Sequence, residues 1–118
     1  MAHVLDQRVL DDLLASVGGD RAFFSELIDE LLDDAPRQLT TLRDAVAAGD
    51  AESARRAAHT LKGNGRTFGA AELASLCQEA EAAAADGDLN AVRLRLETVE
   101  AAWEHVREAL TAVRDGAA

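Results

Sequence analysis

The sequence has 118 residues and a formal net charge of −10 at pH 7, which suits one domain with a single hydrophobic core over residues 1–118. Alanine, leucine, aspartate, glutamate and arginine dominate, tyrosine is absent, and β-branched and aromatic residues are sparse, so the composition predicts an all-α fold. A chain this acidic is a poor general ligand for nucleic acid or an anionic membrane, and we expect neither as a partner.

Cysteine content and hydropathy bear on disulfides, membrane spans and localisation. Cys77 is the single cysteine, which excludes an internal disulfide, and its apolar neighbours indicate buried packing. The N-terminus lacks a long apolar run, and no later segment approaches the length of a membrane span. We therefore expect a cytoplasmic protein.

Two helices are predicted in the first half of the chain. Residues 6–17 form a short amphipathic helix, stopped by two glycines and expected to cover one end of the core. Asp20 is the expected N-cap of a longer helix, which Pro36 should kink or restart near Ala35 and which Gly49 ends. Its acidic residues are interpreted as a solvated outer face. The expected inner side contains Phe23, Phe24, Leu27, Ile28, Leu31 and Leu32.

Three more helices follow. Asp50 should cap a third helix that stops at Gly69, and a fourth is predicted from about Ala70 to Ala85. A turn at 86–88 leads into a last helix over 89–113, followed by a frayed tail at 114–118. Short loops between long helices favour antiparallel neighbours, so we expect an antiparallel up-down four-helix bundle, with its core at about 20–113, plus the extra short N-terminal helix.

The stretch from His59 to Gly69 has an unusual composition for this chain. His59 is rotated by about 100° from the buried stripe that contains Ala58, so it should face outward. It shares that flank with three cations and a glycine, and no acidic residue occurs from Ser53 to Ala71. The flank contains Arg55, Lys62, Gly63 and Arg66. An accessible imidazole with cations around it is therefore expected.

Glycine is costly in this helix, by up to about 1 kcal/mol relative to alanine. Gly63 lies one turn beyond His59 on the same face, where we expect any side chain to crowd the imidazole. Its absence would leave the ring open to a partner or a bulky adduct.

Metal binding, a phosphate-binding loop and catalysis by a serine or cysteine nucleophile all fit this sequence poorly. His3, His59 and His105 have no metal-ligand spacing, so we expect no metal site, and His3 and His105 should simply face solvent. Lys62 precedes the glycines of its segment, unlike the lysine of a phosphate-binding loop. No serine or cysteine is suitably spaced from His59 for nucleophilic catalysis.

A neutral imidazole is itself a nucleophile, and Lys62 can reach a phosphoryl group on it, which would make the bundle a phosphoryl carrier.

The segment resembles the histidine-containing phosphotransfer (HPt) domains of multistep two-component signalling. The sequence His59-Thr60-Leu61-Lys62-Gly63, with Gly69 ten residues past the histidine, follows the family motif H-x-L-K-G. The agreement extends over roughly residues 20–110 and includes 23–36, 47–50 and 76–81.

The resemblance implies that His59 accepts the phosphoryl group, that Lys62 steadies it and that Gly63 keeps the nitrogen accessible. Glu81 matches a polar position of the family and would orient the imidazole if it faces His59; the alternative is a solvated carboxylate. The chain would be a phosphocarrier without a kinase domain or intrinsic cofactor, and, as a five-helix unit that can close its own core, a monomer.

The implied partners are receiver domains of response regulators, a hybrid histidine kinase, or both. The receiver would supply the aspartate and Mg²⁺, and the chain's basic cluster would complement the acidic surface of the receiver, beside apolar residues from the first two helices. The cluster contains Arg55, Arg56, Lys62 and Arg66.

The sequence departs from the family at Asn64, Gly65 and Arg66, where small residues are usual. Gly65 should loosen the last turns of the helix, and Arg66 should alter partner preference. Two other functions stay open: a helical interaction module that docks a receiver-like partner without carrying phosphate, and the dimerisation bundle of a kinase. Thr60 after the histidine, where kinases have an acidic residue, disfavours the second.

Overall fold

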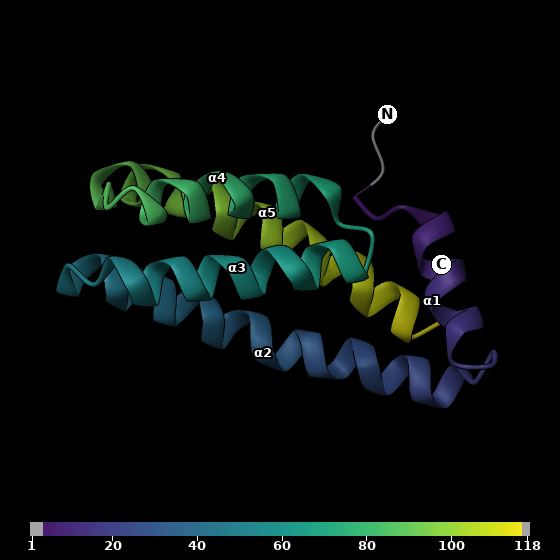
Figure 1. The fold of residues 1–118 in the computed structure, drawn as a ribbon. Coiled ribbons are helices and arrows are strands. Elements are labelled where there is room, and N and C mark those ends of the chain that lie inside the picture. Colours follow the sequence, from purple (N-terminus) through teal and green to yellow (C-terminus); the bar gives the residue numbers. More distant parts are fainter. Residues whose placement is uncertain (1–3, 117–118) are drawn as a thin grey trace.

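The computed structural model describes residues 4–116, and over that range the chain is all helical, as predicted. Four long helices form a bundle, and a short helix precedes them (Figure 1). The helices are α1 (Gln7–Ser16), α2 (Arg21–Ala48), α3 (Ala51–Thr67), α4 (Ala71–Ala85) and α5 (Leu89–Arg114). The expected fold class is thereby confirmed.

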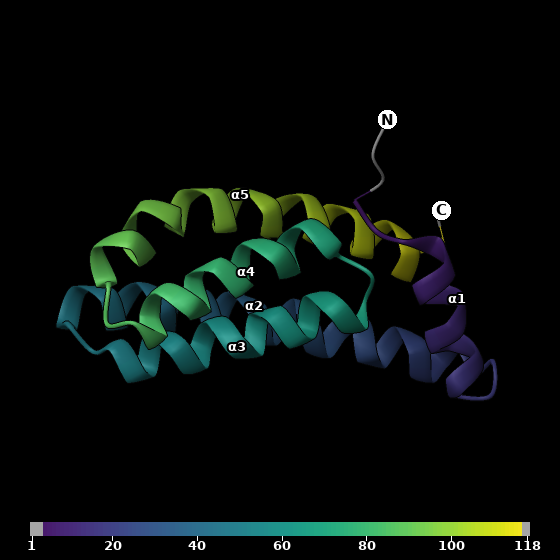
Figure 2. The ribbon, with the colours of Figure 1, turned by 45° about the horizontal axis from the view of Figure 1, so that its top comes forward.

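The four long helices are neighbours in chain order and run alternately up and down. α3 packs between α2 and α4, and α5 closes the bundle by packing against both α4 and α2, so that α3 and α5 lie diagonally opposite each other. Figures 1 and 2 show α1 lying across one end of this bundle. α1 buries only Leu10 completely, in keeping with the expected cover over one end of the core.

Aspartates begin four of the helices. The carboxylate of Asp20 accepts the backbone N–H of Phe23, and that of Asp50 accepts the N–H of Ser53, as predicted. The same contact is made at α1 and α5 by Asp6 and Asp88. Gly49 ends α2 in the left-handed conformation, with φ of 73°, a role for which glycine is suited because it has no Cβ.

Two expectations about α2 need correction. Phe23 does not face the core: it is 44 % exposed, whereas Phe24 is buried. Adjacent helical residues are about 100° apart, so both rings cannot lie on one narrow apolar stripe. The helix also does not restart at Pro36, since α2 is continuous through it. Proline removes a backbone donor and its ring crowds the preceding turn, but buried residues on both sides, Ala35 and Leu42, hold the long helix against the bundle.

The C-terminal end also differs slightly from the expectation. Arg114, predicted to belong to a frayed tail, is the last residue of α5, and its guanidinium is 3.0 Å from Asp29 on α2. His105 is exposed, as expected, and His3 lies outside the described residues. Cys77 is fully buried, and burial raises the pKa of its thiol to about 12, so the thiol stays protonated at neutral pH.

Gly65 has a different role from the expected loosening of α3. It is buried, and a Cβ built on it would lie 3.2 Å from the backbone nitrogen of Ala74 and 3.3 Å from the carbonyl oxygen of Ala70. The glycine therefore allows the backbones of α3 and α4 to approach closely. Gly69, just after α3, combines a φ of +74° with backbone contacts to Asp6, and so joins the bundle to the start of α1.

This close approach predicts that Gly65→Ala destabilises the fold. The added methyl group meets α4 backbone, which cannot move aside cheaply, and overpacking of this kind costs about 1–3 kcal/mol, more than the gain of up to about 1 kcal/mol in helix propensity. Urea unfolding should give a lower free energy of unfolding for Gly65→Ala than for the wild type. The matched control is Gly63→Ala, whose Cβ meets nothing within 4 Å and which should not lower that free energy. Equal stability of Gly65→Ala and the wild type would contradict the packing role.

Candidate functional site

His59 lies on the outer face of α3, about halfway along the helix. Its neighbours Ala58 and Leu61 are fully buried and fix the orientation of α3 against the core. Since His59 is offset from both, its side chain is 62 % exposed. The imidazole is therefore held on a rigid helix, and solvent or a partner can reach it.

One carboxylate contacts both chemically active side chains of α3. Glu81 of α4 places Oε2 at 2.8 Å from His59 Nδ1 and Oε1 at 2.5 Å from Lys62 Nζ. Lys62 and Glu81 are largely covered, with side chains 15 % and 18 % exposed. Lys62 therefore does not lie on an open basic flank as expected, but at the seam between α3 and α4. The structure brings together three of the residues selected from the sequence.

The charge of Glu81 is maintained by its neighbours. The hydrogen bond from Lys62 is the largest influence and lowers the pKa of the Glu81 carboxyl, the hydrogen bond from His59 adds to this, and partial burial opposes both. Glu81 is therefore ionised at neutral pH. An ionised carboxylate only accepts hydrogen bonds, so His59 Nδ1 must carry a proton. In the neutral imidazole the lone pair is then on Nε2, which is the nucleophilic atom.

Gly63 follows His59 by one turn and is exposed, as expected. The reason given for it from sequence needs correction. A Cβ on Gly63 would have no atom of the chain within 4 Å, so it would not crowd the imidazole. Nothing inside the protein requires glycine here, and the space above it is open to another molecule.

The other basic residues of α3 differ in whether their partner is a carboxylate or a neutral amide. Arg55 makes a two-point contact with Glu52, at 3.1 and 2.6 Å, and Arg56 approaches the same carboxylate at 3.9 Å. Arg66 instead donates to the amide oxygen of Gln78 on α4, at 2.8 Å. Glu52 lies just before the acid-free segment, and its helical spacing of three and four residues from the arginines is the sequence signal that identifies these pairs.

The opposite side of His59 borders α2. There Asn64 donates to Asp34 at 3.2 Å, a contact that the sequence analysis did not anticipate. Beside it, a groove of about 320 Å³ runs between α2 and α3. Its lining residues are Leu27, Glu30, Leu31, Asp34, Asn64, Thr67 and Phe68. The apolar side chains of this groove come from α2 and from Phe68 at the end of α3, and α1 contributes none to it.

Residues 4–116 also bear on metal binding and on membrane insertion. Within this range no cluster of three or more His, Cys, Asp or Glu side chains is arranged to hold a metal ion. No helix in the same range has the length and apolar character needed to cross a membrane.

Comparison with known proteins gives consistent results. Residues 26–116 match the Hpt domain family. The chain is 35 % identical over 118 residues to the sensory/regulatory protein RpfC of Xanthomonas campestris pv. campestris; the match covers 96 % of this chain and 16 % of that protein. The chain therefore spans about a sixth of the length of this curated relative. The crystal structure of histidine-containing phosphotransfer protein B (HptB) from Pseudomonas aeruginosa PAO1 superimposes with a TM-score of 0.88 at 32 % identity, covering 98 % of this chain and 97 % of that one.

Proposed function

The chain belongs to the Hpt domain family and is a histidine phosphotransfer intermediate of two-component signalling, and from this premise we propose that His59 carries the phosphoryl group on Nε2. The observation that carries the proposal is the contact between His59 Nδ1 and Glu81, because it leaves Nε2 unprotonated on the exposed edge of the ring.

The transfer step needs no proton to move. The Nε2 lone pair attacks the phosphorus of an aspartyl phosphate, the bond from phosphorus to the aspartate oxygen breaks, and its electron pair stays on the aspartate carboxylate. The imidazole gains a positive charge and keeps its Nδ1 proton, which it donates to Glu81 Oε2, 2.8 Å from Nδ1. Return of the phosphoryl group to an aspartate reverses these changes, so the same geometry serves both directions.

Lys62 supplies charge compensation in this scheme. Its ammonium group has three donors, and one of them engages Glu81. The others can meet the oxygens of a phosphoryl group on the adjacent imidazole, whose negative charge a neighbouring cation stabilises. Phosphoryl transfer depends mainly on positioning and charge neutralisation, and in this scheme the helix provides the first and Lys62 the second.

The proposed partners are receiver domains, either of response regulators or of a hybrid histidine kinase. The receiver would provide the aspartate and bind the Mg²⁺, so that the metal is a cofactor of the partner. The chain itself would act as a monomeric phosphocarrier without enzymatic activity of its own. We also propose a cytoplasmic site of action, where ATP-dependent kinases charge receiver domains.

Replacement of His59 by glutamine tests the phosphoryl site. A panel of receiver domains phosphorylated with radiolabelled phosphate should transfer label to the wild type and not to His59→Gln, because the amide side chain has no nucleophilic nitrogen. The label should be acid-labile and base-stable, as expected of a phosphorylated nitrogen. His105→Gln, which changes an exposed histidine on α5, is the matched control and should keep wild-type labelling. Label on His59→Gln would place the phosphoryl site elsewhere. A wild type that accepts no label from any receiver, with its helical circular dichroism intact, would support an interaction module instead.

Gly63 gives a second prediction, because its open face separates folding from docking. Gly63→Gln should fold with at least wild-type stability, since its Cβ meets nothing within 4 Å and glutamine favours helix more than glycine does. Transfer from a receiver should nevertheless fall by about tenfold or more, because the new side chain occupies the space from which the partner approaches Nε2. Gly63→Ala is the smaller control and should lose less. Full transfer activity of Gly63→Gln would show that the partner does not come over this glycine.

A further inference from the structure

Arg66 differs from the other cations of α3. It lies seven residues after His59, which places it on the same face, about 20° around the helix and about 10 Å along it. Within residues 4–116, no carboxylate lies within 4.0 Å of its guanidinium, and its side-chain partner is the neutral amide of Gln78. Arg55 and Arg56 are already paired with Glu52, and Lys62 with Glu81. Arg66 is thus the α3 cation whose charge is not compensated by an ion pair within the described chain.

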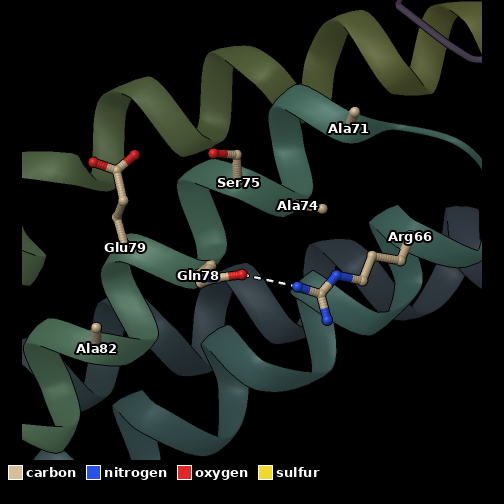
Figure 3. Close-up of a pocket in the computed structure, with 7 residues that line it drawn as sticks. All are labelled: Arg66, Ala71, Ala74, Ser75, Gln78, Glu79 and Ala82. Carbon is tan, nitrogen blue, oxygen red and sulfur yellow. Dashed lines mark hydrogen bonds between the residues drawn. The ribbon is translucent and has the colours of Figure 1, made fainter.

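A groove of about 410 Å³ begins at Arg66 and runs along α4. Figure 3 shows the guanidinium reaching across to Gln78, while the Glu79 carboxylate points away from it. The residues between them have small side chains, so the groove is shallow and leaves Arg66 approachable. Its lining residues are Arg66, Ala71, Ala74, Ser75, Gln78, Glu79 and Ala82.

The groove and the histidine site lie along the same seam between α3 and α4. Gln78 lies one turn before Glu81 on α4, just as Arg66 lies beyond Lys62 on α3. The two polar contacts, Lys62 with Glu81 and Arg66 with Gln78, are therefore successive contacts across one seam. A folded domain is wider than the spacing of about 10 Å between His59 and Arg66 along the helix. A receiver docked on Nε2 from this side would therefore extend over Arg66.

We propose that Arg66 is a specificity-determining residue for the receiver domain. When the receiver docks, the guanidinium of Arg66 gives up its contact with Gln78 and pairs with a carboxylate that the receiver places over the groove. This inference rests on the proposed function of His59. A carboxylate is a stronger partner for guanidinium than an amide oxygen is, because the hydrogen bonds are charge-assisted and two-pronged. The exchange leaves only a neutral amide behind, which solvent can satisfy, whereas Arg55 would have to give up an existing ion pair with Glu52.

Arg66 should affect the association of the receiver with this chain more than the phosphoryl-transfer step at His59. An uncompensated charge at the edge of an interface steers encounter and selects partners, and its removal lowers the association rate and its dependence on salt. Receivers with an acidic residue at the facing position would be preferred over receivers without one. Phosphorylation of His59 by a small donor, which has no such surface, would not depend on Arg66.

The test uses the receiver domain that labels the wild type fastest in the transfer assay above. Arg66→Glu should lower the second-order rate constant of transfer by about tenfold and reduce its salt dependence, and Arg66→Ala should lower it less. The matched control is Arg93→Glu on α5, diagonally opposite α3. Arg93 also donates to a neutral amide, that of Asn90, and the same charge reversal there should change the rate little. Labelling of His59 by phosphoramidate should be equal in the wild type and in all three variants.

The possible results separate this inference from the proposed function. Equal transfer rates for Arg66→Glu and the wild type would overturn the role of Arg66 and leave His59 unaffected. Equal losses in Arg66→Glu and Arg93→Glu would also overturn it, because the effect would then be one of net charge. Loss of phosphoramidate labelling in Arg66→Glu would assign Arg66 to the chemistry of the histidine instead. If no receiver labels the wild type, the proposed function and this inference both fail.

Discussion

The Glu81 carboxylate lies between two side chains of α3, 2.8 Å from His59 Nδ1 and 2.5 Å from Lys62 Nζ. The two contacts together set the charge of Glu81 and the position of the proton on His59. Lys62 keeps Glu81 ionised, ionised Glu81 keeps a proton on Nδ1, and the proton on Nδ1 leaves the Nε2 lone pair directed at solvent. The imidazole is thus hydrogen-bonded by a carboxylate on a different helix, and this contact depends on how closely α3 and α4 pack.

Gly65 allows that packing, because a Cβ there would lie 3.2 Å from the backbone of Ala74. The two glycines of the segment therefore have opposite surroundings. Gly65 faces inward against α4, and Gly63 faces outward with nothing of the chain near it. Gly65 allows the short distance between the helices that hold the site, and Gly63 leaves open space above the surface of α3. From the sequence, Gly63 was expected to leave the imidazole accessible and Gly65 to loosen the last turns of the helix, and the close approach of the α4 backbone to Gly65 was not foreseen.

The sequence predicted the elements better than the contacts between them. Apolar periodicity and the aspartate caps located all five helices, because both signals are local. Phe23 was misplaced because a stripe of apolar residues does not reveal which of two adjacent rings lies at its edge. Helical spacing would have been enough to predict the ion pair of Arg55 with Glu52. It could not predict that Lys62 contacts Glu81 or that Arg66 contacts Gln78. Both depend on which residues of α4 face α3, and the separation of 22 positions between His59 and Glu81 carries no sequence signal of that register.

The measurement that tests the central claim most directly is nuclear magnetic resonance of the chain labelled with nitrogen-15 in histidine and phosphorylated by its receiver. We expect phosphorus to couple to Nε2 of His59, with the Nδ1–H of the same ring hydrogen-bonded to Glu81. Coupling of phosphorus to Nδ1 would contradict the account.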